Sequence, residues 1–364
     1  MASSGSQIFG DMLVDHVEFY VTDLPGKTDW YVGNFGFSVY GTTSWPDAGA
    51  VRSVGLGAND IRLVLTEALD IDHPAATYVA RHGDGVADIG LRVADATAAF
   101  DEAVRRGATV VAAPSEQDGV VTATIAGFGD VAHTFVSRAD GVDERVLPLL
   151  RLVADEPAAG GGLGEVDHFA VCVESGEIDA TVKAYQRILD FELIFTERIA
   201  VGSQAMTTKV VQSRSGAVTL TLIEPDVTRT AGHIDEFLAN HGGAGVQHMA
   251  FTAGNIVDSV GTIGSRGVEF LSTPATYYNL LRDRVELIRY TVDELKKLNI
   301  LADEDHHGQL LQIFARSVHP RNTFFLELIE RLGARSFGSG NIAALYQAVE
   351  LQRHAERAGE AEAA

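Results

Sequence analysis

The sequence predicts an α+β protein of two halves, each built from the same succession of strands and helices around curved sheets. The first observation is an internal repeat, because the strand-like run at residues 14–21 is echoed at residues 166–173. The second is that the glycine-rich run at residues 83–90 is echoed at 243–250, and an amphipathic stretch of helical spacing follows each copy. Repeats on this scale are typical of duplicated supersecondary units.

A segment of unusual composition separates the two halves. Residues 141–164 contain a run of glycine, alanine and proline without periodicity, which is typical of a linker. We therefore expect an N-terminal domain at residues 12–140 and a C-terminal domain at residues 165–340. Residues 341–358 place apolar side chains at helical spacing and are predicted to form a helix that closes a site in the C-terminal domain.

Composition excludes several classes of partner. The chain has 28 basic and 50 acidic residues and a net charge of −22, which argues against binding to nucleic acid or to an anionic membrane. Cys172 is the only cysteine, so neither a disulfide framework nor a thiolate metal site is expected. The N-terminus lacks the features of a signal peptide, and no apolar run is long enough to span a bilayer. We expect a soluble, cytoplasmic protein.

Equivalent positions of the repeat carry a set of metal ligands in the second half. His168 lies in its first strand-like run, His248 in the glycine-rich run and Glu327 in the last run, at separations of 80 and 79 residues. The three side chains meet only if their strands lie side by side in one curved sheet, with alternate side chains facing inward. Two imidazoles and one carboxylate that leave three open positions are typical of mononuclear iron(II) oxygenases. The sequence therefore predicts an iron(II) site.

The first half lacks a complete ligand set. Its equivalent positions hold His16, Asp88 and, from the echo between residues 133–137 and 323–327, Ser137. We therefore expect the N-terminal domain to be metal-free. A single histidine is more often structural than a metal ligand, but Glu327 lies among large apolar residues, where a carboxylate must be paired, protonated or metal-bound.

Five segments resemble motifs of the 4-hydroxyphenylpyruvate dioxygenase family. They lie at residues 166–169, 245–250, 310–314, 325–331 and 336–341. The resemblance implies two tandem vicinal-oxygen-chelate domains, built from paired βαβββ modules that form curved, partly open barrels, with Fe(2+) in the C-terminal one. It also implies 4-hydroxyphenylpyruvate and O2 as substrates, and we expect a homodimer.

The family contains enzymes that form homogentisate, in tyrosine catabolism, and enzymes that form 4-hydroxymandelate, a precursor of the hydroxyphenylglycine of peptide antibiotics. Homogentisate-forming members typically read Pro-Ile-Asn-Glu-Pro at residues 221–225, where this chain has Thr221 and Ile223. They typically carry Phe at the position of Ile342. These departures favour benzylic hydroxylation to 4-hydroxymandelate, with homogentisate formation as the alternative.

Substrate contacts are expected around the metal. Gln312 is the first polar candidate and Gln247 the second, whereas His306 and His307 are interpreted as loop residues. His233 stands where the family commonly has Gln, so this chain lacks any hydrogen bond that such a Gln makes. The complete set of substrate-binding candidates is Thr208, Thr221, Ile223, Gln247, Gln312, Phe314, Phe337 and Ile342.

Two rival functions are compatible with the same fold. A non-catalytic small-molecule-binding protein would not need an intact ligand trio, and here the trio is complete. A ring-cleaving extradiol dioxygenase also uses two histidines and a glutamate, but the Gly-Asn segment at residues 340–341 and the helix expected after it fit the 2-oxo acid family better.

Overall fold

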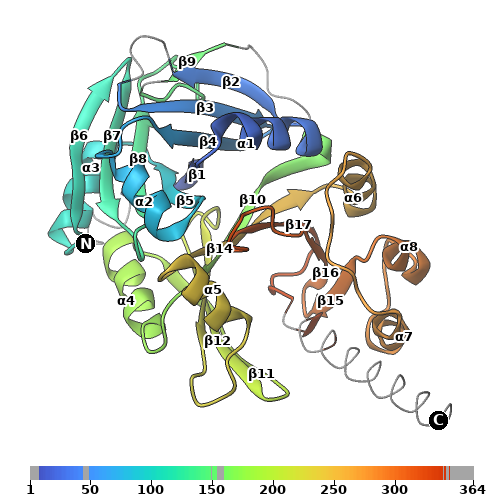
Figure 1. Ribbon diagram of the computed structural model, residues 1–364. Helices are drawn as coiled ribbons and strands as arrows, with labels where there is room; N and C mark the ends of the chain where they lie inside the picture. The colour runs from blue at the N-terminus through green and yellow to red at the C-terminus, as the bar shows by residue number, and fades with distance from the viewer. Residues whose placement is uncertain are drawn as a thin grey trace.

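The computed structural model describes residues 8–43, 49–148, 150–153, 160–338, 340, 341 and 344 of the chain. It consists of two curled sheets, one in each half of the chain, and helices of both halves lie where the halves meet (Figure 1). The predicted fold class is therefore confirmed. Among the described residues, no helix combines the length and apolarity needed to cross a membrane.

The N-terminal sheet has nine strands in the order β6-β7-β8-β5-β1-β4-β3-β2-β9. The elements of this half are β1 (Leu13–Tyr20), α1 (Leu24–Trp30), the π-helical turn η2 (Tyr31–Phe35), β2 (Ser38–Thr43), β3 (Val51–Ala58), β4 (Ile61–Ala68), α2 (Pro74–His82), β5 (Gly85–Arg92), α3 (Ala96–Arg105), β6 (Val110–Gln117), β7 (Val120–Ala126), β8 (Ala132–Arg138) and β9 (Leu150–Leu152).

The C-terminal sheet has eight strands in the order β11-β12-β13-β10-β14-β17-β16-β15. Its elements are the 3₁₀ turn η3 (Gly160–Gly162), β10 (Leu163–Cys172), α4 (Ile178–Leu189), β11 (Glu192–Val201), β12 (Gln204–Gln212), β13 (Thr219–Pro225), α5 (His233–His241), β14 (Gly245–Ala253), α6 (Ile256–Ser265), α7 (Ala275–Arg284), α8 (Val292–Lys297), β15 (Leu301–Asp305), β16 (Gly308–Phe314) and β17 (Phe325–Leu332).

Strand pairing shows that each half contains two βαβββ modules. In each module the first strand pairs in parallel with the last, as β1 does with β4 and β10 with β13. The second module of each half repeats this with β5 and β8, and with β14 and β17. The first strands of the two modules pair antiparallel, β1 with β5 and β10 with β14. Parallel neighbours need a crossover connection, which the helix after each first strand supplies.

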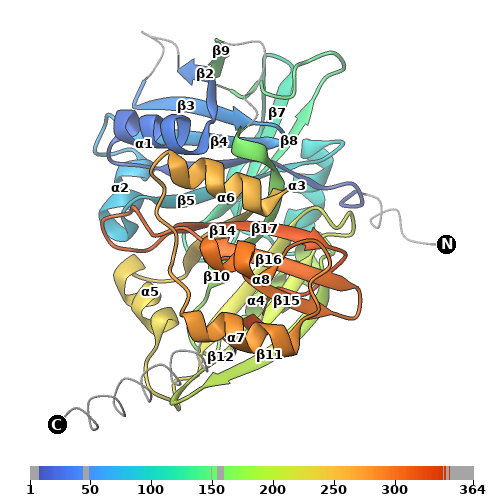
Figure 2. The ribbon, with the colours of Figure 1, turned by 90° about the vertical axis from the view of Figure 1, so that its right-hand side faces the viewer.

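The last module differs from the others by an insertion. Helices α7 and α8 lie between α6 and β15, whereas in the first half α3 leads directly to β6. Figure 2 shows α6, α8 and α7 along one side of the molecule, with α6 next to α1. The contact between the halves on this side includes a hydrogen bond from the Asn34 side chain to the carbonyl of Arg266 (2.7 Å).

One continuous core joins the two sheets. Along each strand, every second side chain points away from the interior of its own sheet and toward the other half. Phe251 of β14 is one of these, and its ring centroid lies 6.1 Å from that of Phe37. Phe19 of β1 meets Phe324 edge-on at 5.1 Å. Because strand side chains alternate between faces, the opposite face of each sheet remains available to line the interior of its own curl.

Two predicted boundaries can be compared with the elements. The expected linker at residues 141–164 contains β9, which extends the first sheet by pairing with β2, and the first residues of β10. Of the expected C-terminal helix at residues 341–358, the structure describes only Asn341 and Ala344, both helical and buried. The rest of this helix, including Ile342, lies outside the described residues.

Candidate metal centre

Three adjacent strands of the C-terminal sheet bring His168, His248 and Glu327 together. His168 of β10 and Glu327 of β17 are both paired with the same residue of the strand between them, Ala250 of β14. His248 precedes Ala250 by two residues and therefore shares its face of the sheet. This pairing register brings the three side chains together over the small side chain of Ala250.

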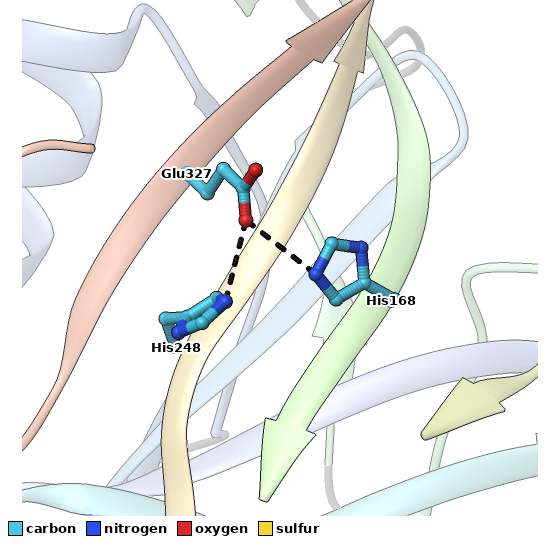
Figure 3. A group of neighbouring side chains, drawn as sticks. All are labelled: His168, His248 and Glu327. Atoms are coloured by element: carbon cyan, nitrogen blue, oxygen red, sulfur yellow. Dashed lines mark ion pairs between the residues drawn. The ribbon is translucent and has the colours of Figure 1, made fainter. Parts of the chain in front are cut away.

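The ligand atoms are close enough to share one metal ion. Nε2 of His168 lies 3.4 Å from Oε2 of Glu327, and Nε2 of His248 lies 3.3 Å from the same oxygen (Figure 3). The three ligand atoms lie within 4.8 Å of one another. His168 is 4% exposed and Glu327 2% exposed, whereas the His248 side chain is 12% exposed, so the site is largely buried and solvent can reach it at His248.

A buried chain of charged residues orients His168. Its Nδ1 is hydrogen-bonded to Oδ1 of Asp167 (2.8 Å), and Arg331 donates to both carboxylate oxygens of Asp167 (2.6 and 2.8 Å). An ionised carboxylate only accepts, so Nδ1 carries the proton and Nε2 presents its lone pair to the site. Asp167 and Arg331 therefore fix both the tautomer and the direction of this imidazole.

The electrostatics of these three side chains favour a shared proton. Burial lowers the pKa of His168, but hydrogen bonds to Asp167 and Glu327 outweigh burial and raise the pKa to about 9. Burial also raises the pKa of Glu327, yet the hydrogen bonds from the two histidines hold it below its ordinary value. For His248, burial dominates and lowers the pKa. A divalent cation would replace this proton and hold Glu327 ionised.

The donor set fits iron(II). Two imidazole nitrogens and one carboxylate oxygen on one face of a site match the arrangement that non-haem iron(II) oxygenases use. Within the described part of the chain, the ion-pair partners of Glu327 are the two histidines alone, and His248 Nδ1 is buried without a hydrogen-bond partner. The buried carboxylate therefore has a charge that a metal cation is suited to neutralise.

Three predicted substrate contacts line the inner wall beside the metal ligands. Thr221 of β13 pairs with Ala170, which in turn pairs with His248, so Thr221 faces the same interior. Its hydroxyl is buried and has no hydrogen-bond partner among the described residues. Thr208 of β12 pairs with Ile223 of β13, and both are buried.

The opposite wall carries Gln312, Phe314 and Phe337. Phe314 of β16 pairs with Glu327, and its ring lies 5.8 Å from that of His248. Gln312 shares the strand and the face of Phe314 and is 3% exposed. The Phe337 ring meets His168 edge-on at 5.4 Å.

Gln247 lies apart from this wall, at an irregularity in β14. Ala170 pairs with His248 but the next residue, Val171, pairs with Val246, so Gln247 is an extra residue in the ladder. The bulge turns Val246 to the core between the halves while His248 faces the metal site. Gln247 itself is buried.

Sequence reasoning missed several residues of the site. Phe325 stacks on His248 at 4.9 Å and 23°, and Phe195 contacts Phe337 at 6.3 Å. Asp167 and Arg331 were also missed, although the sequence carried a signal for both. Asp precedes the first of these histidines in each half, and an arginine lies at the end of the corresponding strand, as the last residue of β8 and the penultimate residue of β17.

One predicted equivalence was wrong. In the first half Asp88 pairs with Ala132 and Leu91 with Phe135, which makes Thr134 the counterpart of Glu327. The predicted counterpart, Ser137, instead corresponds to Glu330. The error arose because a similar pattern of apolar residues does not fix how two strands align, whereas backbone pairing does. Thr134 donates a hydrogen bond from its backbone N–H to Asp88 (3.1 Å).

The extra histidines lie outside the triad. His306 and His307 are exposed in the turn between β15 and β16, on the rim of a surface groove that Phe195 and Phe337 also line. His233 is the first residue of α5 and is exposed.

Comparisons with known proteins agree with this geometry. Residues 13–133 and 167–283 each match a model of the Glyoxalase/Bleomycin resistance protein/Dioxygenase superfamily. A variant of 4-hydroxymandelate synthase from Streptomyces coelicolor superposes with a TM-score of 0.83 at 41% identity, covering 94% of this chain and 99% of that one. The 4-hydroxyphenylpyruvate dioxygenases of Dictyostelium discoideum and Neurospora crassa are 33% and 30% identical, covering 93% and 94% of this chain and 97% and 92% of theirs.

The paired modules and the two matches define a protein with two tandem domains of that superfamily, one of which carries a His-His-Glu site. Within the superfamily, the chain belongs to the 4-hydroxyphenylpyruvate dioxygenase family.

Proposed function

We propose that this protein is an iron(II)-dependent dioxygenase that converts 4-hydroxyphenylpyruvate and O2 into 4-hydroxymandelate and CO2. The observation that carries the proposal is the buried triad of His168, His248 and Glu327 in a chain 41% identical to a 4-hydroxymandelate synthase variant over 94% of its length. Identity to the two relatives named 4-hydroxyphenylpyruvate dioxygenase is lower, at 33% and 30%. This difference supports 4-hydroxymandelate over homogentisate as the product.

The interior next to the triad offers groups for each part of the substrate. Phe314 and Phe337 lie against the ligand histidines and provide apolar faces for an aromatic ring. The unsatisfied Thr221 hydroxyl costs roughly 1–3 kcal/mol while it lacks a partner. A polar group of the substrate that reaches Thr221 removes this cost, and Gln312 supplies an amide on the opposite wall.

Bound iron(II) would supply the chelation and redox chemistry by which a 2-oxo acid reacts with O2. The chain holds its ligands and keeps water away from them, because Phe325 covers the face of His248 and Phe337 covers the edge of His168.

The reaction balances without another reductant. The original carboxyl group of the substrate leaves as CO2, one atom of O2 enters the new carboxyl group of the product, and the other becomes its benzylic hydroxyl. The benzylic hydrogen that the carbon loses ends on that hydroxyl. The four electrons that O2 requires therefore come from the substrate, two from decarboxylation and two from oxidation of the benzylic carbon.

The wall at Ile223 supports benzylic rather than ring hydroxylation. Ile223 is 8% exposed and packs in an apolar cluster with Ala170, Cys172 and Met206. Homogentisate-forming members of the family typically carry Asn at this position, where an amide can hydrogen-bond to the substrate. An apolar wall gives the ring no such fixed point, so the benzylic carbon can approach the reacting oxygen.

Product analysis tests the proposal. Protein loaded with iron(II) under argon is mixed with 4-hydroxyphenylpyruvate and O2, and the products are separated by chromatography. We expect one 4-hydroxymandelate per O2 consumed, loss of turnover on chelation, and loss of turnover in His168→Ala, His248→Ala and Glu327→Ala. His16→Ala should leave the metal content unchanged. Homogentisate as the main product would overturn the proposal while leaving the metal site intact.

Variants at the predicted product-determining positions refine this test. Ile223→Asn restores an amide to the wall, and Ile342→Phe restores the aromatic residue typical of homogentisate-forming members. We expect each to raise the homogentisate share, since 1.4 kcal/mol of relative barrier changes a product ratio about tenfold. An unchanged ratio in the double variant would contradict the assignment of product choice to these positions.

A further inference from the structure

A buried polar network connects the inserted helix α7 to the interior of the C-terminal sheet. It runs from Arg284 and Tyr277 of α7 through Asn341 to Gln312 of β16. We propose that Arg284, Tyr277 and Asn341 are positioning residues that turn the amide of Gln312 so that its NH2 group, and not its oxygen, faces the metal centre. The proposal rests on the proposed function insofar as Gln312 contacts the substrate.

The chain after β17 passes unusually close to β15 and β16, which makes the network possible. A Cβ atom at Gly338, whose φ is +71°, would overlap Oε1 of Gln312, and one at Gly340 would overlap the carboxylate of Asp303. At Gly338 the positive φ favours glycine, and at Gly340 the missing side chain leaves room for Asp303 in its present position. Asn341, the next residue, is 1% exposed, and its backbone N–H donates to the carbonyl of Gly338 (3.0 Å).

The direction of every hydrogen bond in the network follows from Arg284. A guanidinium can only donate, and Nη2 of Arg284 lies 3.1 Å from the side-chain oxygen of Asn341. The atom of Asn341 on this side must therefore be its oxygen. Its NH2 group then faces Gln312 and donates to Oε1 (3.3 Å). Because the Gln312 oxygen accepts this hydrogen bond, the NH2 group of Gln312 points away from Asn341. It lies on the face of β16 that Gln312 shares with Phe314.

Tyr277 reinforces the same orientation. Its hydroxyl accepts from the backbone N–H of Ala302 (3.0 Å), which leaves the hydroxyl proton to be donated. Two acceptors lie within reach of this proton, the Asn341 oxygen at 2.7 Å and the Ala302 carbonyl at 3.1 Å, and the shorter distance favours Asn341. Tyr277 is fully buried, so this donor has no competing water. The Asn341 oxygen thus receives two donors, and a flipped amide would oppose its NH2 group to the guanidinium of Arg284.

The orientation has a chemical consequence for ligand choice. A donor on this wall complements the carboxylate and 2-oxo oxygens of a 2-oxo acid, which are acceptors only. An amide oxygen in its place would repel them. In a chain of net charge −22, a fixed donor on this wall helps to select an anionic substrate without a cationic side chain at that place.

The central experiment inverts the amide without removing the network. Asn341→Asp places an acceptor opposite Arg284, which pairs with it, and a second acceptor opposite Gln312. Gln312 must then turn its NH2 group toward residue 341 and its oxygen toward the metal. We measure the affinity of 4-hydroxyphenylpyruvate for the cobalt(II)-loaded protein under argon by calorimetry, together with the melting temperature. Loss of one charge-assisted hydrogen bond should weaken binding at least about tenfold.

A double-mutant cycle separates this effect from simple charge repulsion. If Asn341→Asp acts through Gln312, it should change affinity little when Gln312 is already Leu. Repulsion of the substrate by the new carboxylate would persist in that background. A tenfold loss that persists in Gln312→Leu overturns the proposal, and so does an unchanged affinity in Asn341→Asp.

Neighbouring residues of α7 supply matched controls. Tyr278 is also buried and donates to a backbone carbonyl, that of Ile300, without touching Asn341. Arg282 is exposed and pairs with Asp293. Tyr277→Phe and Arg284→Met should weaken substrate binding more than Tyr278→Phe and Arg282→Met do. Equal effects within each pair would assign α7 a structural role alone. If wild-type protein binds the substrate but forms no 4-hydroxymandelate, the proposed function fails and this inference still stands or falls on the affinities.

Discussion

At the scale of single residues, the candidate metal site depends on a side chain that is not one of its three candidate ligands. Asp167 fixes the tautomer of His168 and is itself held by Arg331. The same arrangement occurs in the other half, where Arg138 holds Asp15 and Asp15 bonds His16 (2.9 Å). The N-terminal copy lacks the carboxylate ligand, because Thr134 stands in place of Glu327. The Asp15–His16 pair can therefore serve as a control for substitutions at the Asp167–His168 pair.

Asp167→Asn tests this control directly. An asparagine can donate its NH2 group to Nδ1 of His168, which moves the ring proton to Nε2 and removes the lone pair that would bind the metal. We expect the metal dissociation constant to rise about 10–100-fold, the range typical of such outer partners. Asp15→Asn changes the same contact at His16 and should leave metal affinity unaltered. Titration of both variants with cobalt(II) measures the two dissociation constants. Equal metal affinities of the two variants would show that Asp167 does not set the tautomer of His168.

The ligand trio itself could be predicted because the repeat aligned three positions that carry His, His and Glu. Its supports could not be predicted in the same way. The distance between Arg331 and Asp167 in the chain is 164 residues, and nothing in a single sequence says that these two charges meet. The assignment of Ser137 was wrong for the same reason, since a shift of three positions in β8 leaves the apolar pattern nearly intact.

At the scale of elements, each half anchors a helix through one strand residue. This residue lies three positions after Glu327 in the second half and three positions after its counterpart Thr134 in the first. Glu330 of β17 accepts from the backbone N–H of Ile256 at the start of α6 (2.7 Å), and Tyr290 also donates to it (2.7 Å). In the first half, Ser137 of β8 accepts from the N–H of Ala96 at the start of α3 (3.1 Å). A helix N-terminus carries unpaired donors and a partial positive charge, so the carboxylate is the stronger anchor.

Glu330→Ala should therefore destabilise the protein more than Ser137→Ala. Glu330 is 3% exposed, and its loss leaves the backbone N–H of Ile256 and the guanidinium of Arg289 without this acceptor. We expect the free energy of unfolding to fall by about 3 kcal/mol for Glu330→Ala and by about 1 kcal/mol for Ser137→Ala. Urea denaturation followed by circular dichroism measures both. Metal stoichiometry of the folded Glu330→Ala protein should stay at one, and similar losses in the two variants would contradict the stronger role of the carboxylate.

At the scale of the whole molecule, buried histidines join the two halves. His133 of β8 is hydrogen-bonded to the Tyr185 hydroxyl of α4 (2.6 Å), and His319 bonds the carbonyl of Asp84 (3.1 Å). The ring of His241 stacks on that of His82 at 4.3 Å. Burial lowers the pKa of His133, His241 and His319 to about 4 in each case. Neutral imidazoles are thus part of the interface.

Acid should therefore weaken the contact between the halves. The unfolded chain binds these protons near pH 6.5, whereas the folded protein binds them only near pH 4, so stability falls as the pH drops from about 6.5 to 4. By pH 5 the loss is about 2 kcal/mol for each such histidine. Urea denaturation at pH 7.5 and pH 5 measures it. His319→Asn should reduce the difference and His307→Asn, at an exposed position, should not; an equal pH effect in both variants would exclude His319 as a contributor.

The sequence alone determined the division into two halves, the α+β class and the three residues of the candidate metal site. It could do so because the periodicities of strands and helices, and the duplication, can be recognised from the order of residues along the chain. The strand register that converges the ligands over Ala250, the charged support of His168 and the amide orientation of Gln312 were decided by the tertiary structure. Each depends on contacts between residues far apart in the chain, because a hydrogen bond or a strand pair forms only where folding brings its two partners together.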